Sequence, residues 1–367
     1  MTLLGDFNFG NKLQLYAVSS IWKSFGYAAE QLWYERPKKP LAHPKETAWK
    51  LIGNGSALHD ERRGKERVSA FNRFNQLIPV RKFDSIAEIN SDDYAYFSVG
   101  SDQVWNPGYA GVVGGTLRNA WHTVTDPTAY ADSLKWYFLG FAEREQRIAL
   151  APSLGVDSLD SRQAKWLAEG VSNFKNISIR EERGAWLIKE CSGREATILC
   201  DPTLVITQSE WGRLADDRET PNKPYVLAYL LGEQNKESAE ALRLATNGGD
   251  LPIVYLSDLS RPGEPDAGPA EFISLVAHAC HVVTDSFHAS VFSCIFERPL
   301  TIVHRDGNGA GMFSRMESLA NMLGVQTKIW TPNSYDKSNA ADYEGVSDGI
   351  ARERERFLTY LEGCING

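Results

Sequence analysis

Residues 282–289 read Val282-Val283-Thr284-Asp285-Ser286-Phe287-His288-Ala289, and this stretch decides the fold. An apolar strand over 281–284 runs directly into a helix over 288–296, with Asp285, Ser286 and His288 at the turn. Ser286 stands where a helix is usually capped, and a helix N-terminus at the end of a strand is a prepared site for an anion. A purely structural role fits the same residues, with Asp285 and Ser286 as caps and His288 in the core.

Strands and helices alternate on both sides of this stretch. Strands are predicted at 177–180, 197–200, 225–231, 253–256 and 300–303, and helices at 181–190, 239–245, 269–279 and 312–323. Such alternation predicts a parallel sheet with helices on both faces. Parallel sheets of this kind bind ligands at the carboxyl ends of their strands.

The first half of the chain is less regular. Helices are predicted at 10–25, 59–76 and 161–174, and strands at 94–99, 136–141 and 148–151, with a glycine-rich stretch from 105 to 136. A chain of 367 residues is too long for one core. We therefore expect two α/β domains across a cleft: an N-terminal domain over 1–174, and a Rossmann-like domain over 175–345. A last helix over 346–361 is placed to pack back on the first domain.

Composition excludes several classes of protein. The formal net charge of -8 argues against a nucleic-acid-binding protein. The five cysteines form no CxxC pair, which favours a reducing compartment without a disulfide framework. We find no signal peptide and no apolar run long enough to span a bilayer. The sequence therefore predicts a cytoplasmic protein and leaves contact with the inner membrane surface open.

Three further segments carry candidate binding residues. Arg180 ends a strand and offers a guanidinium that can hold a phosphate or carboxylate at two points, although an ordinary ion pair explains it equally well. Residues 97–107 form a strand and a polar loop, in which Gly100 lets the backbone approach a ligand. Residues 8–14 open the first helix and present backbone amides.

Several familiar chemistries are missing from the sequence. It contains no DxD triplet, Walker A motif, nucleophile elbow or HExxH motif. The seven histidines are scattered, and His278 and His281 lack a third ligand. We therefore expect no metal and no cofactor.

Taken in order, eight segments resemble the polysaccharide pyruvyl transferase family. They are residues 8–17, 100–107, 137–141, 151–155, 178–182, 201–204, 284–288 and 314–319, of which 100–107 and 284–288 are the most specific. The resemblance implies two domains similar to the GT-B glycosyltransferase fold, with the N-terminal domain over 1–174 on the acceptor side. It also implies transfer of an enolpyruvyl group from phosphoenolpyruvate to a sugar hydroxyl on a cell-surface glycan or its precursor, with release of phosphate and closure of a ketal.

The resemblance also implies roles for individual residues. His288 matches the family's catalytic histidine and is assigned general acid and base work, since a neutral imidazole at a helix N-terminus is ready to accept a proton. Arg180 is assigned to the phosphate or carboxylate. The expected substrate-binding residues are Asn8, Gly10, Asn11, Lys12, Gly100, Ser101, Asp102, Gln103, Trp105, Asn106, Ser153, Asp285, Ser286 and Arg315.

One departure from the family concerns an arginine. Some members have Arg-Leu-His where this chain has Ser286-Phe287-His288, so another cation must replace the missing arginine. Lys12, Arg305 and Arg315 are the candidates. The stretch over 108–135 is longer than usual and is a candidate contact for the acceptor, which the sequence leaves open as lipid-linked, nucleotide-linked or free.

Two other functions fit the same architecture. A metal-independent glycosyltransferase would release a nucleotide from a nucleotide sugar, whereas a pyruvyl transferase releases phosphate from phosphoenolpyruvate. A non-catalytic sugar-binding protein is the third possibility, and the retention of Arg180 and His288 argues against it.

Overall fold

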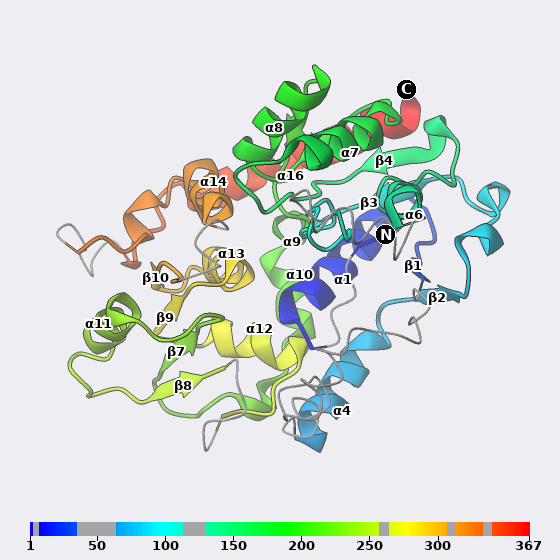
Figure 1. The fold of residues 1–367 in the computed structure, drawn as a ribbon. Helices are drawn as coiled ribbons and strands as arrows, with labels where there is room; N and C mark the ends of the chain where they lie inside the picture. The colour runs from blue at the N-terminus through cyan, green and yellow to red at the C-terminus, as the bar shows by residue number, and fades with distance from the viewer. Residues whose placement is uncertain (3–6, 35–63, 113–128, 257–263, 307–312, 333–339) are drawn as a thin grey trace, which may run out of the picture.

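The computed structural model describes residues 1–2, 7–34, 64–112, 129–256, 264–306, 313–332 and 340–367. Within these ranges helices alternate with short strands (Figure 1). All strand pairs in the described ranges are parallel. The predicted α/β class with parallel sheets is therefore confirmed.

The largest sheet has four strands in the order β10-β9-β7-β8. They are β7 (Val226–Tyr229), β8 (Ile253–Tyr255), β9 (His281–Thr284) and β10 (Leu300–Ile302). Val226 and Ala228 pack on one side against helix α11 (Lys236–Ala245). Leu227 packs on the other side with α12 (Pro269–Ala277) and α13 (Phe287–Ile295). Helices cover both faces, which is why β7 and β9 are buried along their length.

Three further parallel pairs lie in the rest of the chain. They are β1 (Gln31–Tyr34) with β2 (Val80–Phe83), β3 (Phe97–Val99) with β4 (Arg147–Ala149), and β5 (Ser178–Ile179) with β6 (Thr197–Ile198). The Ser178 hydroxyl donates to the Ala149 carbonyl at 2.6 Å and accepts from the Ala151 amide at 2.9 Å. This bridge holds the end of β4 beside β5.

The remaining helices connect and cover these strands. The α-helices are α1 (Phe9–Ser24), α4 (Lys65–Asn75), α6 (Ala129–Tyr137), α7 (Ser161–Ser172), α8 (Glu182–Ser192), α9 (Pro202–Val205), α10 (Gln208–Leu214), α14 (Ser314–Leu323) and α16 (Val346–Asn366). The short 3-10 helices are η1 (Ile86–Glu88), η2 (Ser91–Asp93), η3 (Arg144–Gln146), η4 (Asp217–Glu219) and η6 (Gln326–Lys328).

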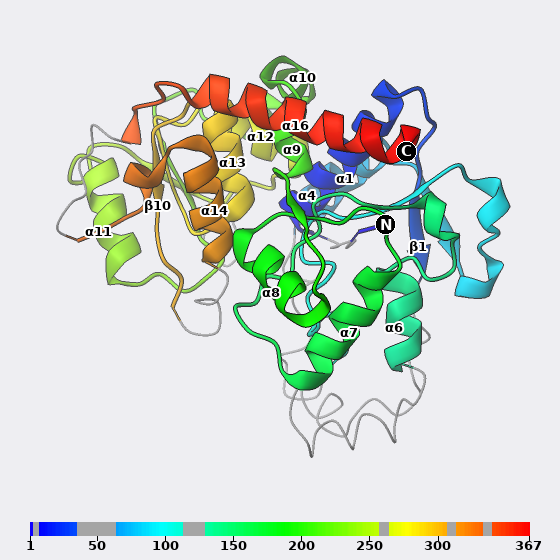
Figure 2. The ribbon, with the colours of Figure 1, turned by 90° about the horizontal axis from the view of Figure 1, so that it is seen from above.

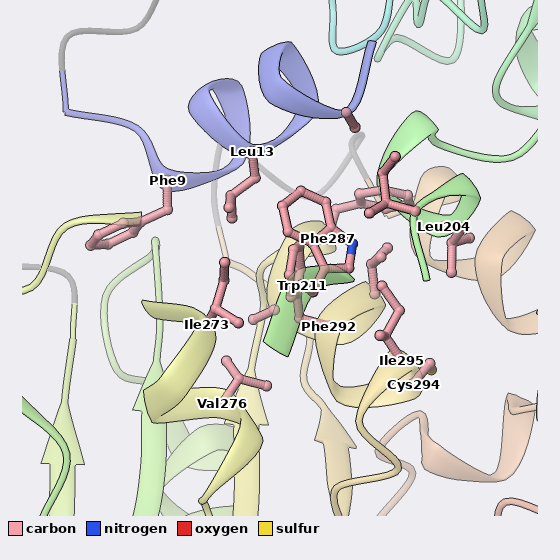
Figure 3. Packing of buried hydrophobic residues seen from close by; sticks show 14 of the residues in the cluster. Phe9, Leu13, Leu204, Trp211, Ile273, Val276, Phe287, Phe292, Cys294 and Ile295 are labelled. Atoms are coloured by element: carbon pink, nitrogen blue, oxygen red, sulfur yellow. The ribbon is translucent and has the colours of Figure 1, made fainter. Parts of the chain in front are cut away.

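Two large hydrophobic cores organise the molecule. The first joins α1 to the four-stranded sheet: Phe9 stacks on Phe272 with ring centroids 5.1 Å apart, and Phe292 packs behind them (Figure 3). The second core surrounds β3 and β4 and includes Ile179 and Leu187. The predicted domain boundary near residue 174 stays a prediction, but the cores do not part there. Helix α1 packs with the C-terminal sheet, whereas β5 and α8 pack with the N-terminal strands.

Helix α16 runs along the top of both parts (Figure 2, red). Its Phe357 and Leu361 are fully buried in the first core. Its Arg354 Nε donates to the Val205 carbonyl at 2.7 Å. Its last turn reaches Tyr96, whose hydroxyl donates to the Ile365 carbonyl at 3.1 Å. No helix in the described part of the chain is long and apolar enough to cross a membrane.

One strand prediction was wrong. Residues 136–141 were expected to form a strand, but Trp136 and Tyr137 end helix α6 and a turn follows them. An aromatic run has high strand propensity, yet packing decides its conformation. Here the Phe138 ring packs edge-on against Trp166 of α7, with centroids 4.8 Å apart. Strands β1 and β2 and helices α9 and α10 were not predicted. Residues 59–63 of the second predicted helix and 113–128 of the long stretch lie outside the described residues.

Candidate active site

A cavity of about 630 Å³ opens at the carboxyl ends of β7, β9 and β10. The N-terminus of α1 and residues from β1, α6 and the loop after β3 complete its wall. Its polar and charged lining comprises Thr2, Asn8, Asn11, Asp102, Gln103, Asp285, Ser286, His288, Arg305 and Arg315. The cavity therefore lies at the edge of the sheet where the strand–helix alternation predicts ligand binding.

His288 stands in the first turn of α13 and is nearly buried, with 11% of its side chain exposed. Helix α1 approaches it closely at Gly10. A Cβ atom at this position would lie 2.0 Å from His288 Nδ1, so only glycine fits. Burial lowers the pKa of His288 from 6.5. The nearby positive charges of Arg180 and Arg315 lower it further, whereas the negative charges of Asp201 and Asp102 raise it. The imidazole is therefore neutral at neutral pH and available to accept a proton.

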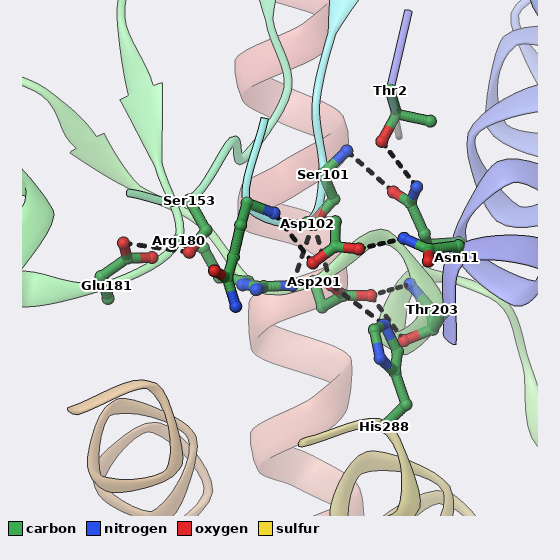
Figure 4. Close-up of polar contacts among 12 residues, drawn as sticks. Thr2, Asn11, Ser101, Asp102, Ser153, Arg180, Glu181, Asp201, Thr203 and His288 are labelled. Atoms are coloured by element: carbon green, nitrogen blue, oxygen red, sulfur yellow. Dashed lines mark hydrogen bonds and ion pairs between the residues drawn. The ribbon is translucent and has the colours of Figure 1, made fainter. Parts of the chain in front are cut away.

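Asp201, between β6 and α9, is the carboxylate that faces His288. It is fully buried, and its Oδ2 lies 2.6 Å from Arg180 Nη1, 2.9 Å from Ser101 Oγ and 3.8 Å from His288 Nε2 (Figure 4). Its Oδ1 accepts from the amide and hydroxyl of Thr203. Burial alone would raise its pKa, but His288, Arg180 and Thr203 together lower it from 3.8 to about 2.

Arg180 does not line the cavity. Its guanidinium is 3% exposed and lies against the Phe287 ring, 4.4 Å from the centroid, and Phe287 lines the cavity in its place. Its Nη1 bonds Asp201 and Ser101, whereas Nε and Nη2 are buried without a hydrogen-bond partner in the described structure. The ordinary ion pair considered for Arg180 is thus present. Its contact with a ligand stays a prediction.

Of the three cations considered as replacements for the missing arginine, two line the cavity. Lys12 is buried in α1 and does not reach it. Arg305 is neutralised by Asp285, whose Oδ2 lies 3.0 Å from its Nε. Arg315 forms no ion pair with any carboxylate in the described ranges. The side-chain amide of Gln103 fits its neighbours best when its oxygen faces Arg315. In that orientation the oxygen accepts a hydrogen bond from Arg315 Nη2 at 2.9 Å.

Arg315 is therefore the cation best placed to receive an anion. Burial, with the nearby Arg180, lowers the pKa of its guanidinium to about 10 despite the attraction of Asp102 and Glu181, so it stays charged at neutral pH. Its Nε is buried without a partner in the described structure. A buried donor left unpaired is costly, so this side chain is held in the cavity wall at some cost in stability.

The loop after β3 brings several predicted residues to the same place. Asp102 and Gln103 line the cavity, and the Asp102 carboxylate accepts from the Asn11 side chain and from the Gln103 amide. Ser101 belongs to the Asp201 network. A Cβ atom at Gly100 would lie 2.0 Å from the Leu150 carbonyl oxygen. The glycine is therefore needed because two segments of the chain pass close to each other here, and not because a ligand approaches the backbone.

The other predicted residues divide between wall and support. Asn8 and Ser286 line the cavity and are the N-cap residues of α1 and α13. The Asn8 side chain accepts a hydrogen bond from a backbone amide of its helix, whereas the Ser286 side chain makes no such bond. Asp285 lines it but accepts from the amides of Leu231 and Gly232, so its main contact is with the loop after β7. The supporting residues away from the cavity are Trp105, Asn106 and Ser153.

Sequence reasoning did not single out Asp201, Phe287 or the aromatic residues of the cavity wall. Residues 201–204 were included among the segments that resemble the family, but Asp201 was given no role, although an aspartate directly after a predicted strand was itself a usable signal. In the described ranges, no group of three or more His, Cys, Asp or Glu side chains is arranged to hold a metal ion. The expectation that no metal is needed remains to be tested.

The sequence matches the model of the family described as polysaccharide pyruvyl transferase over residues 8–306. A search of curated proteins found no match. Among solved structures, the UDP-GlcNAc 2-epimerase from Neisseria meningitidis bound to UDP-GlcNAc aligns with 97% of this chain and 98% of that chain, at 11% identity and a TM-score of 0.33. So remote a likeness gives no information on the substrate or the reaction.

We predict that Asp201→Asn destabilises the protein by roughly 3 to 5 kcal/mol, because it leaves the buried Arg180 charge without its partner. The double variant Asp201→Asn/Arg180→Met should recover part of this loss. Urea unfolding measures both. The exposed pair Arg243–Glu240 supplies the control, since Glu240→Gln should change stability by less than about 1 kcal/mol. A double variant no more stable than Asp201→Asn would show that the two side chains are not coupled.

Proposed function

This chain belongs to the polysaccharide pyruvyl transferase family, and we propose that it moves an enolpyruvyl group from phosphoenolpyruvate to a sugar hydroxyl. The product is a pyruvate ketal on a cell-surface glycan or its precursor, such as an exopolysaccharide unit. The chain is thus a transferase. The donor, the ketal chemistry and the acceptor are the parts that we propose.

The observation that supports this best is the pairing of His288 and Arg315 in one cavity. Phosphoenolpyruvate carries a carboxylate and a phosphate, so its site needs fixed cationic donors and a proton-transfer group. Arg315 is a half-buried cation without an ion pair in the described structure, and His288 is a neutral imidazole that faces the Asp201 carboxylate. The helix N-termini of α1 and α13 add backbone amides at the same wall.

The chemistry follows from these groups. A proton from solvent adds to the methylene carbon of phosphoenolpyruvate and makes its C2 electrophilic, and a sugar hydroxyl attacks C2 while it loses its proton to His288. The C2–O bond to phosphate then breaks, and the departing phosphate takes the proton from His288. A neighbouring hydroxyl attacks C2, releases its proton to solvent and closes the ketal. Asp201 stabilises the imidazolium that forms when His288 holds a proton. Arg315 neutralises the charge that develops on the departing phosphate.

The wider setting is also proposed. Phosphoenolpyruvate as donor places the reaction in the cytoplasm, and a lipid-linked acceptor would bring the enzyme to the inner face of the membrane. No cofactor enters the reaction.

A metal-independent glycosyltransferase that uses a nucleotide sugar is the alternative. The aromatic side chains of the cavity favour it in one respect, because a nucleobase stacks on aromatic rings.

Phosphate release tests the proposal. With phosphoenolpyruvate and a panel of glycosides, we expect phosphate release that depends on the acceptor, and a product heavier by pyruvate less water in the mass spectrum. Chelation should leave the initial rate unchanged. Release of a nucleotide from a sugar nucleotide, without phosphate release from phosphoenolpyruvate, would replace the proposal with the glycosyltransferase.

We expect Arg315→Lys to raise the apparent KM for phosphoenolpyruvate although the charge is kept, because an ammonium lacks the planar fork of a guanidinium. The loss of one charge-assisted hydrogen bond corresponds to roughly 1.5 to 3 kcal/mol. Arg305→Lys should have a smaller effect, since Asp285 already neutralises Arg305. Steady-state kinetics with both variants tests this ranking, and a larger effect at Arg305 would reverse it.

His288→Asn should lower turnover by roughly 10²- to 10⁴-fold while phosphoenolpyruvate binding changes much less. In the wild type, kcat/KM should fall only below pH 6.5, because the pKa of the base is lowered and the imidazole loses its lone pair as pH decreases. His278→Asn, on α12 outside the cavity, is the matched control. A folded His288→Asn variant with normal turnover would remove His288 from the mechanism.

A further inference from the structure

The cavity has two unlike walls. One comes from the carboxyl ends of the four-stranded sheet and the start of α14, and it carries both arginines of the lining and His288 beside several apolar side chains. The other consists of five aromatic residues from the N-terminal half of the chain: Trp33, Tyr34, Tyr109, Trp136 and Tyr137. The first wall suits a small dianionic donor. The second offers no cation and must serve another ligand.

The aromatic wall is held in place by its own contacts. The rings of Tyr34 and Trp136 meet edge to face with centroids 5.6 Å apart. Trp136 and Tyr137 are 7% and 8% exposed and belong to the second core, so they are fixed by packing. The Tyr137 hydroxyl donates to the Tyr109 carbonyl at 3.3 Å. The wall is therefore arranged before any ligand binds.

Tyr109 is the outermost member of this wall. It lies in a tight loop that Asn106 organises: the Asn106 side chain accepts from the Gly108 amide at 2.9 Å, and its carbonyl accepts from the Tyr109 amide at 3.1 Å. The Tyr109 side chain is 56% exposed. The polar loop over 100–107 thus presents an aromatic ring at the edge of the cavity.

A second exposed apolar side chain faces the same cavity. In the described ranges five large hydrophobic residues are exposed, and two of them, Tyr109 and Leu231, line this cavity. They come from different parts of the fold, Tyr109 from the loop after β3 and Leu231 from the loop after β7. Exposed apolar surface gathered at a cavity indicates a ligand that covers it.

We propose that the aromatic wall is the acceptor subsite and that Tyr109 stacks on the C–H face of an uncharged pyranose ring. A pyranose has apolar C–H faces and a hydroxyl edge, and Tyr and Trp match it with a flat apolar ring and a polar tip. Arg315 and His288, which line the same cavity, then hold the donor, and we expect the hydroxyl edge of a pyranose on Tyr109 to face that donor. The assignment rests on the proposed function and deepens it, since it specifies an uncharged sugar unit as the acceptor.

Ligand-observed NMR titrations test the subsite without turnover. The probes are methyl β-D-galactopyranoside, methyl β-D-glucopyranoside and methyl α-D-mannopyranoside, with uridine as a stacking competitor, all in the presence of inorganic phosphate. At least one pyranoside should bind. Tyr109→Ala should weaken its binding about three- to tenfold, the range expected for one aromatic stacking contact, and Tyr109→Phe should retain it. Trp186→Ala is the control, because Trp186 is 48% exposed on α8 and lies outside the cavity.

Three results would overturn the subsite: no pyranoside binds, Tyr109→Ala binds the pyranosides as the wild type does, or only uridine binding depends on Tyr109. The enzymatic proposal fails separately. Pyranoside binding that depends on Tyr109, without phosphate release from phosphoenolpyruvate, would keep the subsite and reject the donor. Acceptor-dependent phosphate release with an acceptor KM unchanged in Tyr109→Ala would keep the reaction and reject the subsite.

Discussion

The buried Asp201 carboxylate is the interaction on which the rest of the site depends. It accepts hydrogen bonds from Arg180 after β5, from Ser101 after β3 and from Thr203 in its own helix, and it faces His288 of α13. Ile179 and Leu204 flank this cluster and belong to the two different hydrophobic cores. One charge therefore ties the N-terminal strands to the C-terminal sheet at the place where the cavity forms.

A buried charge destabilises a protein unless hydrogen-bond and ion-pair partners surround it. The partners of Asp201 offset this cost and also hold its carboxylate in one position. Asp201 is ionised far below neutral pH, and the neutral His288 above it can take up a proton without creating an isolated charge. Gly10 allows α1 to close over the imidazole from the other side. The same packing that buries the histidine thus gives it a counter-ion for the protonated state.

Local pattern was enough to predict the four-stranded sheet and the helices that cover it, because its strands are short and each is closed by a clear turn, although α9 and α10 were missed. The strand and helix around Asp285 and His288 were predicted within one residue. Long-range packing decided what the sequence did not predict. The aromatic run at Trp136 folds as a helix end because α7 packs on it, and Asp201 gains its role only when Arg180, Ser101 and His288 meet. Arg180 and His288, which the sequence assigned to the site, both lie beside Asp201, whereas the ring of Phe287 against Arg180 could not be inferred from residue order.

A protein with a formal net charge of -8 has to capture an anion by local means. Its overall field is screened beyond about 8 Å at physiological ionic strength, so the charges that matter are those in the cavity wall. Arg305 is held by Asp285 and Arg180 by Asp201, and each pair is neutral as a unit. Arg315 remains the cation without a carboxylate partner in the described ranges. Its guanidinium stays charged at neutral pH and lines the cavity, so the local field at this part of the wall would attract an anion in spite of the net negative charge of the protein.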